Sequence, residues 1–259
     1  CWRCGTHQLT EVLAEVLHIS PSQARKLIQQ YRGNTRVRYR KEVEQKVSIH
    51  PLRFPQPNSP LSPLYRQYLE GRGFDSKQLE DTWGLLQTGP ISTLDGISYS
   101  YRILIPIYWD RQLVSFQARD ITGKSPFRYL ACPAKREKIP HKTILYGHQE
   151  VWVKYNTIIV VEGVTDVWRL GEIAAATFGI EFKTEQVIQL SKHADNFFIL
   201  YDNEPRAQQQ ARKLAVKLSA LNKKVEVVTV DTDPGDMKQE DADYFVKQLV
   251  PSFTHRRGE

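Results

Sequence analysis

The sequence predicts a mixed fold in which an α+β region is followed by an α/β region built on a parallel sheet. Between residues 64 and 155, a helical pair precedes strands that alternate around a short turn, which is typical of an α+β unit. From Thr157 onward, short apolar runs alternate with helices, and this alternation favours a parallel sheet covered on both faces. A helical segment comes before both regions.

The composition is that of a globular protein and speaks against a membrane protein. Of the 259 residues, 41% are hydrophobic and 25% are charged, which suffices for one large domain or a few small ones. No window holds the ~20 apolar residues of a membrane span, and from the first residues, CWRCG, we expect no secretory signal. Three cysteines make no disulfide framework, so we expect a reducing compartment, the cytoplasm. The net charge of +7 permits a polyanionic partner.

The N-terminal segment predicts two short helices and a strongly basic stretch. Apolar residues at helical spacing run from Leu9 to Leu17, and Ser20-Pro21 is typical of a helix start. Basic residues outnumber acidic ones from Arg25 to Lys46, so this pair could also be a DNA-binding helix-turn-helix. Because the chain begins at Cys1 and not at Met, we expect an upstream portion to be missing.

The next elements follow a proline-rich stretch. Five prolines in residues 50–63 predict an extended linker and a domain boundary. Residues 64–89 predict a helix, a glycine turn and a second helix. Residues 101–109 and 113–119 predict two strands around an Asp110-Arg111 turn, and residues 128–133 predict a third strand.

In the α/β region each apolar run is followed by a loop and a helix. The expected strands lie at residues 157–161, 174–179, 197–201 and 223–230. Helices are expected at 184–194 and 205–221, and a C-terminal helix and tail at 241–259. Ligand sites of such sheets lie beyond the carboxyl ends of the strands.

Acidic residues follow three of these strands. Since the carboxyl ends of parallel strands share one edge of a sheet, we expect the carboxylates to converge there and to repel one another. Carboxylate oxygens of this kind suit Mg²⁺. Each carboxylate taken alone has a simpler explanation as a helix cap or a turn residue. The three groups are Glu162 and Asp166; Asp202 and Glu204; and Asp231, Asp233 and Asp236.

The spacing of these residues resembles the Toprim domain, and the preceding motifs resemble the catalytic core of DnaG-type DNA primases. YLEGRGF at residues 68–74 and RILIPIYWDRQLVSFQARD at 102–120 resemble the entry helix and strands of that core, and the resemblance runs from about residue 64 to 240. RYLACP, HK and LYG follow in the family's order. The Toprim-like positions are Glu162, Gly163, Asp166, Gly179, Asp202, Glu204, Asp233 and Asp236.

The sequence departs from the family at three places. Asp202-Asn203-Glu204-Pro205-Arg206 replaces the usual Asp-x-Asp-x-Ala-Gly, keeps both carboxylates and looks more like certain phage primases. Arg128-Tyr129 replaces Lys-Tyr, and Ala131-Cys132-Pro133 replaces Asn-Ser-Pro. A phage or plasmid origin fits the first departure.

The resemblance implies template-directed synthesis of short RNA primers on single-stranded DNA from ribonucleoside triphosphates, with a replicative helicase as partner in the bacterial cytoplasm. Catalysis would use Glu162, Asp202 and Glu204 on Mg²⁺ or Mn²⁺. Asp233 and Asp236 would add metal ligands, and Gly163 and Asp166 would support the loop. The residues implied for binding nucleic acid and triphosphate are Arg102, Arg119, Arg128, Tyr129 and Lys142.

Three points stay open at this stage. Trp109 and Tyr146 could stack on bases or belong to the core. Cys1 and Cys4 are half of a zinc site, so Zn²⁺ is expected only if upstream ligands are present. Another Toprim enzyme, such as a Mg-dependent nuclease, and a non-catalytic DNA-binding module are the alternative functions.

The predicted domain organisation has five parts. They are a partial zinc-ribbon end and basic helical segment (1–49), the linker (50–63), the basic N-terminal subdomain of the primase core (64–155), the Toprim domain (156–240), and the C-terminal helix and tail (241–259).

Overall fold

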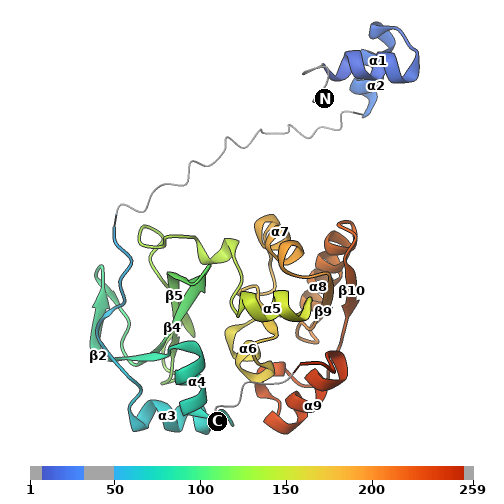
Figure 1. Ribbon diagram of the computed structural model, residues 1–259. Coiled ribbons are helices and arrows are strands. Elements are labelled where there is room, and N and C mark those ends of the chain that lie inside the picture. Colours follow the sequence, from blue (N-terminus) through green and yellow to red (C-terminus); the bar gives the residue numbers. More distant parts are fainter. Residues whose placement is uncertain (1–7, 32–49, 254–259) are drawn as a thin grey trace. The chain divides into compact units, whose positions relative to one another are not determined.

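The computed structural model describes residues 8–31 and 50–253, which belong to two units (Figure 1). The first unit comprises Cys1–Lys46, and the second comprises Val47–Glu259. Both predicted sheets lie in the second unit, so the candidate site is described within that unit alone.

The described part of the first unit is a pair of helices, as the sequence predicts. Helix α1 spans Leu9–Leu17 and helix α2 spans Pro21–Tyr31. Ser20 caps α2, because its Oγ accepts a hydrogen bond of 3.3 Å from a backbone N–H in the first turn. The expected zinc ligands Cys1 and Cys4 lie outside the described residues.

The second unit begins with an antiparallel sheet in the order β1-β2-β4-β5-β6, with β3 paired to β2. Strands β4, β5 and β6 are the three that the sequence predicts, whereas β1, β2 and β3 are additional. β4 and β5 turn at Asp110-Arg111, as expected. The strands span Gln56–Ser59 (β1), Leu86–Leu94 (β2), Ile97–Ser98 (β3), Arg102–Trp109 (β4), Gln112–Asp120 (β5) and Tyr129–Ala131 (β6).

Part of the proline-rich stretch 50–63 belongs to this sheet. Residues 56–59 form β1, which pairs with β2, and Leu61 is only 5% exposed. Pro57 is the one proline within β1, and it is tolerated because β1 is an edge strand, where a missing N–H costs no ladder hydrogen bond on the open side. The composition therefore predicted the extended backbone, but not its pairing.

Two helices follow β1, as the sequence predicts, and two short helical segments lead to the second sheet. Helix α4 is capped by Asp75, whose side chain accepts from the N–H of Gln78 at 2.9 Å, and ends at Gly84 with φ of 64°. The segments span Pro63–Glu70 (α3), Ser76–Trp83 (α4), His141–Thr143 (η1) and Gln149–Tyr155 (α5).

The second sheet is parallel, with the order β10-β9-β7-β8, and confirms the predicted α/β region. β7 is buried along its whole length, as expected of a strand covered on both faces. The elements span Thr157–Val161 (β7), Val164–Leu170 (α6), Ala174–Ala176 (β8), Thr184–His193 (α7), Asn196–Ile199 (β9), Pro205–Ser219 (α8), Lys224–Val227 (β10), Pro234–Asp236 (η2) and Gln239–Leu249 (α9).

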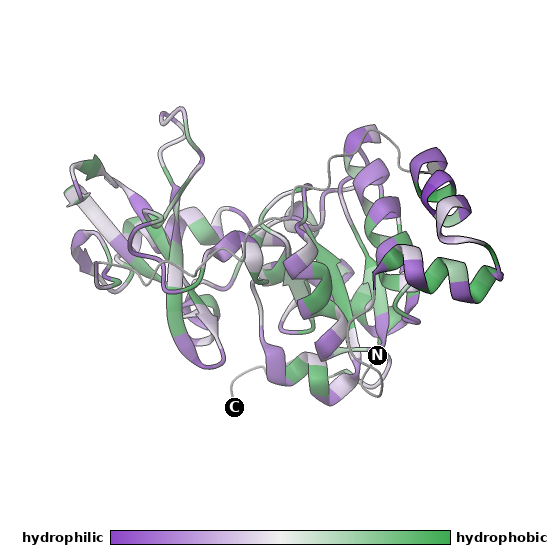
Figure 2. Ribbon diagram, turned by 90° about the horizontal axis from the view of Figure 1, so that it is seen from above, coloured by the Kyte–Doolittle hydropathy of each residue, from purple (hydrophilic) through white to green (hydrophobic). Residues whose placement is uncertain are grey.

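One hydrophobic core joins the two sheets. Ile103, Ile105 and Ile107 of β4 belong to the same buried cluster as β7, whereas Leu104 faces a smaller cluster on the other side of the antiparallel sheet. This alternation follows the two-residue period of a strand. Figure 2 shows the hydrophobic colouring on the central strands between more polar helices. The antiparallel and parallel halves are therefore fixed to one another by packing.

Gly147 provides a test of this packing. Its φ is 144°, and a Cβ there would meet Cζ2 of Trp152 and lie 2.6 Å from the carbonyl oxygen of Ala174. We expect Gly147→Ala to lower the free energy of unfolding by about 3 kcal/mol, because backbone strain and overpacking act together. Gly96→Ala is the control, since Gly96 has φ of 77° with nothing within 4 Å, and should cost only about 1 kcal/mol. Urea titrations that give equal losses would contradict the packing argument.

Candidate active site

The predicted carboxylates gather at the carboxyl end of the parallel sheet. Glu162 directly follows β7, Asp202 follows β9, and Glu204 precedes the first turn of α8. Asp166 lies in the first turn of α6, which packs against η2; Asp233 caps η2, and Asp236 is its last residue. Residues up to 74 positions apart in the sequence (162 to 236) are thus placed at one edge of one sheet.

The carboxylates are close enough to change one another's protonation. Burial raises the pKa of Glu162 to about 7, and the charges of Asp202, Asp233 and Glu204 add to this. Burial, followed by Asp233, raises the pKa of Asp166 to about 8. Burial, followed by Asp233 and Glu204, raises the pKa of Asp202 to about 6. Repulsion among uncompensated negative charges is the common cause beside burial.

Backbone N–H groups hold several of these side chains in place. Glu162 Oε1 accepts from the N–H of Asp202 at 2.9 Å, and Asp233 Oδ1 accepts from the N–H of Gly235 at 2.8 Å. Asp166 Oδ2 accepts from the N–H of Gly163 at 2.8 Å, so this residue caps α6 and orients the loop. Each hydrogen bond fixes the direction of one carboxylate oxygen.

The donor set suits a hard divalent cation, although no binding geometry is assembled. Among residues 8–31 and 50–253, no three His, Cys, Asp or Glu side chains lie close enough together to hold one ion. The crowded carboxylates have raised pKa values, however, and a divalent cation relieves that repulsion. Asp231 is exposed and is not among the charges that raise these pKa values.

A basic pocket lies beside the acidic edge. Three arginines line it, Arg72, Arg119 and Arg128, together with Asp236 from the acidic group. Arg72 was not predicted as a site residue, although it lies inside the YLEGRGF motif. Its Nη2 is 2.6 Å from Asp236 Oδ1, so one ion pair connects the pocket to the carboxylates.

Arg119 lines this pocket, and its guanidinium contacts Tyr129, which lies near Asp166 of α6. Arg119 Nε donates to the hydroxyl of Tyr68 at 2.9 Å, and its guanidinium donates to the hydroxyl of Tyr129 and lies 5.1 Å from the ring centroid. Burial raises the pKa of Tyr129, and the positive charge of Arg119 opposes this rise. These contacts position two predicted site residues next to the acidic edge.

Arg102 has a different place from the one expected. Its side chain is buried and donates to the carbonyl of Ala118 at 3.1 Å and to Ser125 Oγ at 2.7 Å. It therefore supports the antiparallel sheet and the loop before β6, and it does not line the basic pocket. A sequence motif identifies such an arginine but cannot say which of its donors are already used.

The remaining predicted residues divide between site and core. Lys142 donates to the carbonyl of Phe178, next to Gly179, whose N–H donates to the carbonyl of Glu162 at 2.8 Å. Trp109 and Tyr146 are buried core residues, and Tyr146 stacks on Trp83 with centroids 5.0 Å apart. Neither aromatic ring is available to a base.

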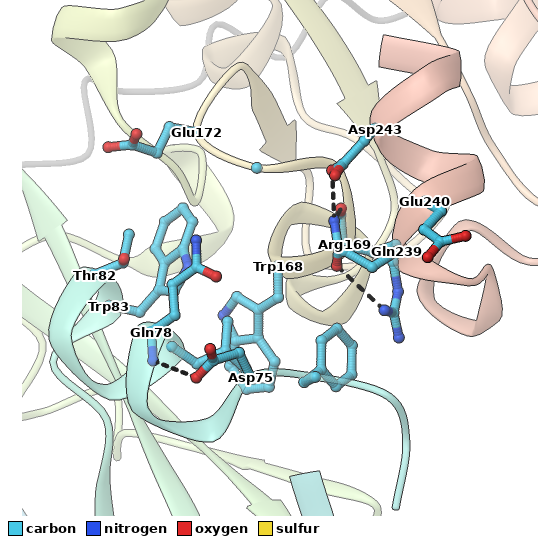
Figure 3. Close-up of a pocket in the computed structure, with 13 residues that line it drawn as sticks. Asp75, Gln78, Thr82, Trp83, Trp168, Arg169, Glu172, Gln239, Glu240 and Asp243 are labelled. Carbon is cyan, nitrogen blue, oxygen red and sulfur yellow. Dashed lines mark hydrogen bonds between the residues drawn. The ribbon is translucent and has the colours of Figure 1, made fainter. Parts of the chain in front are cut away.

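A second buried arginine fixes the turn that carries Arg72. Arg169 donates to the carbonyl oxygens of Arg72 and Gly73 at 2.7 and 2.8 Å, and its guanidinium lies 4.1 Å from the ring centroid of Phe74. Figure 3 shows Arg169 beside Gln239 of α9 in a pocket that contains none of the predicted site residues. These contacts connect the turn after α3, in the antiparallel half, to α6 of the parallel half.

The raised pKa values predict how the stability of the metal-free protein depends on pH. Carboxyl groups with raised pKa bind protons more tightly when folded, so stability should fall as the pH rises from 4.5 to about 8. We expect Asp166→Asn to reduce this fall and to keep the cap on α6, because an amide oxygen also accepts from Gly163. Melting temperatures at pH 5 and pH 8 measure the effect.

Asp231→Asn is the matched control for this experiment, because Asp231 is exposed in the neighbouring loop. It should retain the pH dependence of the unmodified chain. An Asp166→Asn protein with an unchanged dependence would show that Asp166 does not hold the extra proton.

Known structures share this fold. No family model and no curated protein matches the chain. The zinc-binding and RNA polymerase domains of the Aquifex aeolicus primase match with a TM-score of 0.64 and 20% identity over 97% of this chain and 72% of that chain. A DnaG primase catalytic domain bound to ssDNA matches with a TM-score of 0.61 and 19% identity over 73% of this chain and 72% of that chain.

The RNA polymerase domain of the Mycobacterium tuberculosis primase DnaG gives a similar result. It has a TM-score of 0.59 and 19% identity over 73% of this chain and 75% of that chain. With identities of this size the likeness concerns the fold. The chain therefore has the fold of the DnaG-type primase catalytic core.

Proposed function

We propose that this chain is a DNA primase, a DNA-directed RNA polymerase that synthesises short RNA primers on a single-stranded DNA template. The observation that carries the proposal is the group of carboxylates at the end of the parallel sheet, with a basic pocket beside it. The fold supports the proposal, because the similar structures are primase domains and one of them is bound to ssDNA. We assign the parallel-sheet half to the Toprim domain.

The acidic residues would have two roles, as metal ligands and as residues that hold the loop after β7. Glu162, Asp202 and Glu204 would hold the divalent ions, and Asp233 and Asp236 would complete the set. Mg²⁺ or Mn²⁺ would supply charge neutralisation on the triphosphate and activation of the attacking 3′-hydroxyl. Gly163 and Asp166 fix the loop after β7 through the hydrogen bond between them.

The basic residues would bind the polyanionic reactants. Arg128 is exposed in the basic pocket, and Arg119 is held in place by Tyr68 and Tyr129, so both suit phosphate groups of the template or of the incoming nucleotide. Lys142 lies at the turn of Phe178 and Gly179, and the N–H of Gly179 donates to the carbonyl of Glu162. Arg102 has a supporting role in this scheme, because its donors are used within the sheet.

Further parts of the proposal concern partners and organisation. Ribonucleoside triphosphates would be the substrates and a replicative helicase the partner, and the variant at residues 202–206 fits a phage or plasmid primase. Cys1 and Cys4 would bind Zn²⁺ together with upstream ligands. The boundary between residues 155 and 156 would separate two subdomains that share one core. Within the described residues, no helix has the length and apolar character needed to span a membrane.

Glu162→Gln is the first test. Removal of this charge should reduce primer synthesis on single-stranded DNA by about 100-fold or more, the scale on which single preorganised charge-stabilising groups act. Labelled ribonucleotides, Mg²⁺ and gel separation of short RNA products provide the measurement. Glu226→Gln is the matched control, since Glu226 is exposed on β10, and it should keep full activity.

The same assay separates the alternatives. Metal-dependent cleavage of the DNA without incorporation of ribonucleotides would establish a nuclease. Binding of DNA that needs no metal and yields no product would establish a binding module. Full primer synthesis by Asp202→Ala would refute the assignment of the metal ligands.

A further inference from the structure

The ion pair between Arg72 and Asp236 joins two surfaces with opposite charge. Arg72 lies in the turn between α3 and α4, and its Nη2 is 2.6 Å from Asp236 Oδ1 at the end of η2. The Asp236 side chain is 60% exposed and that of Arg72 is 24% exposed. A pair this open to water is weak and can be exchanged for other partners.

The position of Arg72 does not depend on this ion pair. Its backbone carbonyl accepts from Arg169 Nη2 at 2.7 Å, and the next carbonyl, that of Gly73, accepts from Arg169 Nη1 at 2.8 Å. Arg169 is 1% exposed and belongs to α6 (Figure 3). The turn is therefore held from behind through its backbone, and the Arg72 side chain can change partners while the turn stays in place.

The Arg72 guanidinium is also incompletely satisfied. Its Nη1 is buried and has no hydrogen-bond partner within the described residues. A buried donor without an acceptor carries a free-energy cost, which weakens the preference for the present arrangement.

Asp236 also lies near the other carboxylates of the acidic edge. It lies close enough to Asp202 to contribute to the charge around that residue. A cation that enters among the carboxylates would attract Asp236, and Arg72 is the group that holds its oxygen. The Arg72 guanidinium and such a cation would therefore compete for the Asp236 carboxylate.

We propose that Arg72 is a positioning residue that competes with the metal ion for Asp236. In the metal-free protein Arg72 holds the Asp236 carboxylate in the basic pocket, and Asp236 joins the other carboxylates only after this ion pair opens. The inference rests on the proposed function only in placing the divalent cation at the acidic edge.

Binding of Mn²⁺ alone to the full chain tests this competition by calorimetry. Arg72→Gln removes the competitor and should tighten Mn²⁺ binding about two- to five-fold, the range that corresponds to an exposed ion pair. The fold should be preserved, because the carbonyl that accepts from Arg169 remains, and circular dichroism checks this.

Arg128→Gln is the matched control. Arg128 lines the same pocket and carries the same charge, but its side chain makes no ion pair within the part of the chain that the structure describes. It should change Mn²⁺ affinity less than Arg72→Gln does. Equal changes in the two variants would mean that the loss of any nearby positive charge has this effect. That result would overturn the proposal.

Asp236→Asn completes a double-mutant cycle. The gain from Arg72→Gln should vanish in the Asp236→Asn background, because the contested carboxylate is absent. A gain that persists there would also overturn the proposal. If Asp236→Asn abolishes Mn²⁺ binding, the comparison of Arg72→Gln with Arg128→Gln decides alone.

These measurements do not depend on primer synthesis. A chain that makes no primers but shows the expected Mn²⁺ cycle would refute the primase proposal and retain the competition. A chain that makes primers but does not show the expected Mn²⁺ binding pattern would support the primase proposal and refute the competition.

Discussion

Repulsion among carboxylates at the end of the parallel sheet is the constraint on which the arrangement of this molecule depends. Glu162, Asp166 and Asp202 all have raised pKa values because they are buried near other negative charges. The fold tolerates this crowding by giving acidic side chains a backbone N–H, as for Glu162, Asp166 and Asp233. Such crowding is unfavourable unless a positive charge is near, which is the physical basis on which we propose a divalent cation here.

The antiparallel half supplies arginines whose side chains differ in how many internal contacts they make. The Arg102 guanidinium donates to a backbone carbonyl within the sheet, and the Arg119 guanidinium donates to two tyrosine hydroxyls. Arg72 has one ion pair, and Arg128 is exposed. The residues with the fewest internal partners are the ones that can meet a phosphate without losing a contact that the fold needs. Burial and hydrogen bonding, rather than charge alone, therefore separate the arginines that we propose to bind phosphate from the structural ones.

Much of this could be predicted from the sequence, for a physical reason in each case. Apolar runs followed by helices predicted the parallel sheet, and the acidic residues after those runs predicted the crowded edge, because parallel strands must end together. The turn at Asp110-Arg111 and the helices around Gly71 were predicted from local patterns as well. Each of these features follows from a local pattern in the chain, either directly or through the rule that parallel strands end at the same edge.

The features that escaped prediction depend on distant partners. Strand β1 pairs with β2 although its prolines suggest a linker, and Arg102 looks like a binding residue until its acceptors in Ala118 and Ser125 are known. Arg72 gains its importance from Asp236, 164 residues away. Tyr146 and Trp109 are large aromatic residues, and the sequence does not distinguish a ring that stacks on a base from one that packs in the core, as Tyr146 does against Trp83.

The core shared by the two sheets has a consequence for how this protein can change over time. Ile103, Ile105 and Ile107 cover the same apolar interior as β7, so neither half offers a finished surface where the other one ends. A half transferred alone to another protein would present that row of isoleucines to water. Substitutions at the junction of the two halves therefore have to be matched on both sides.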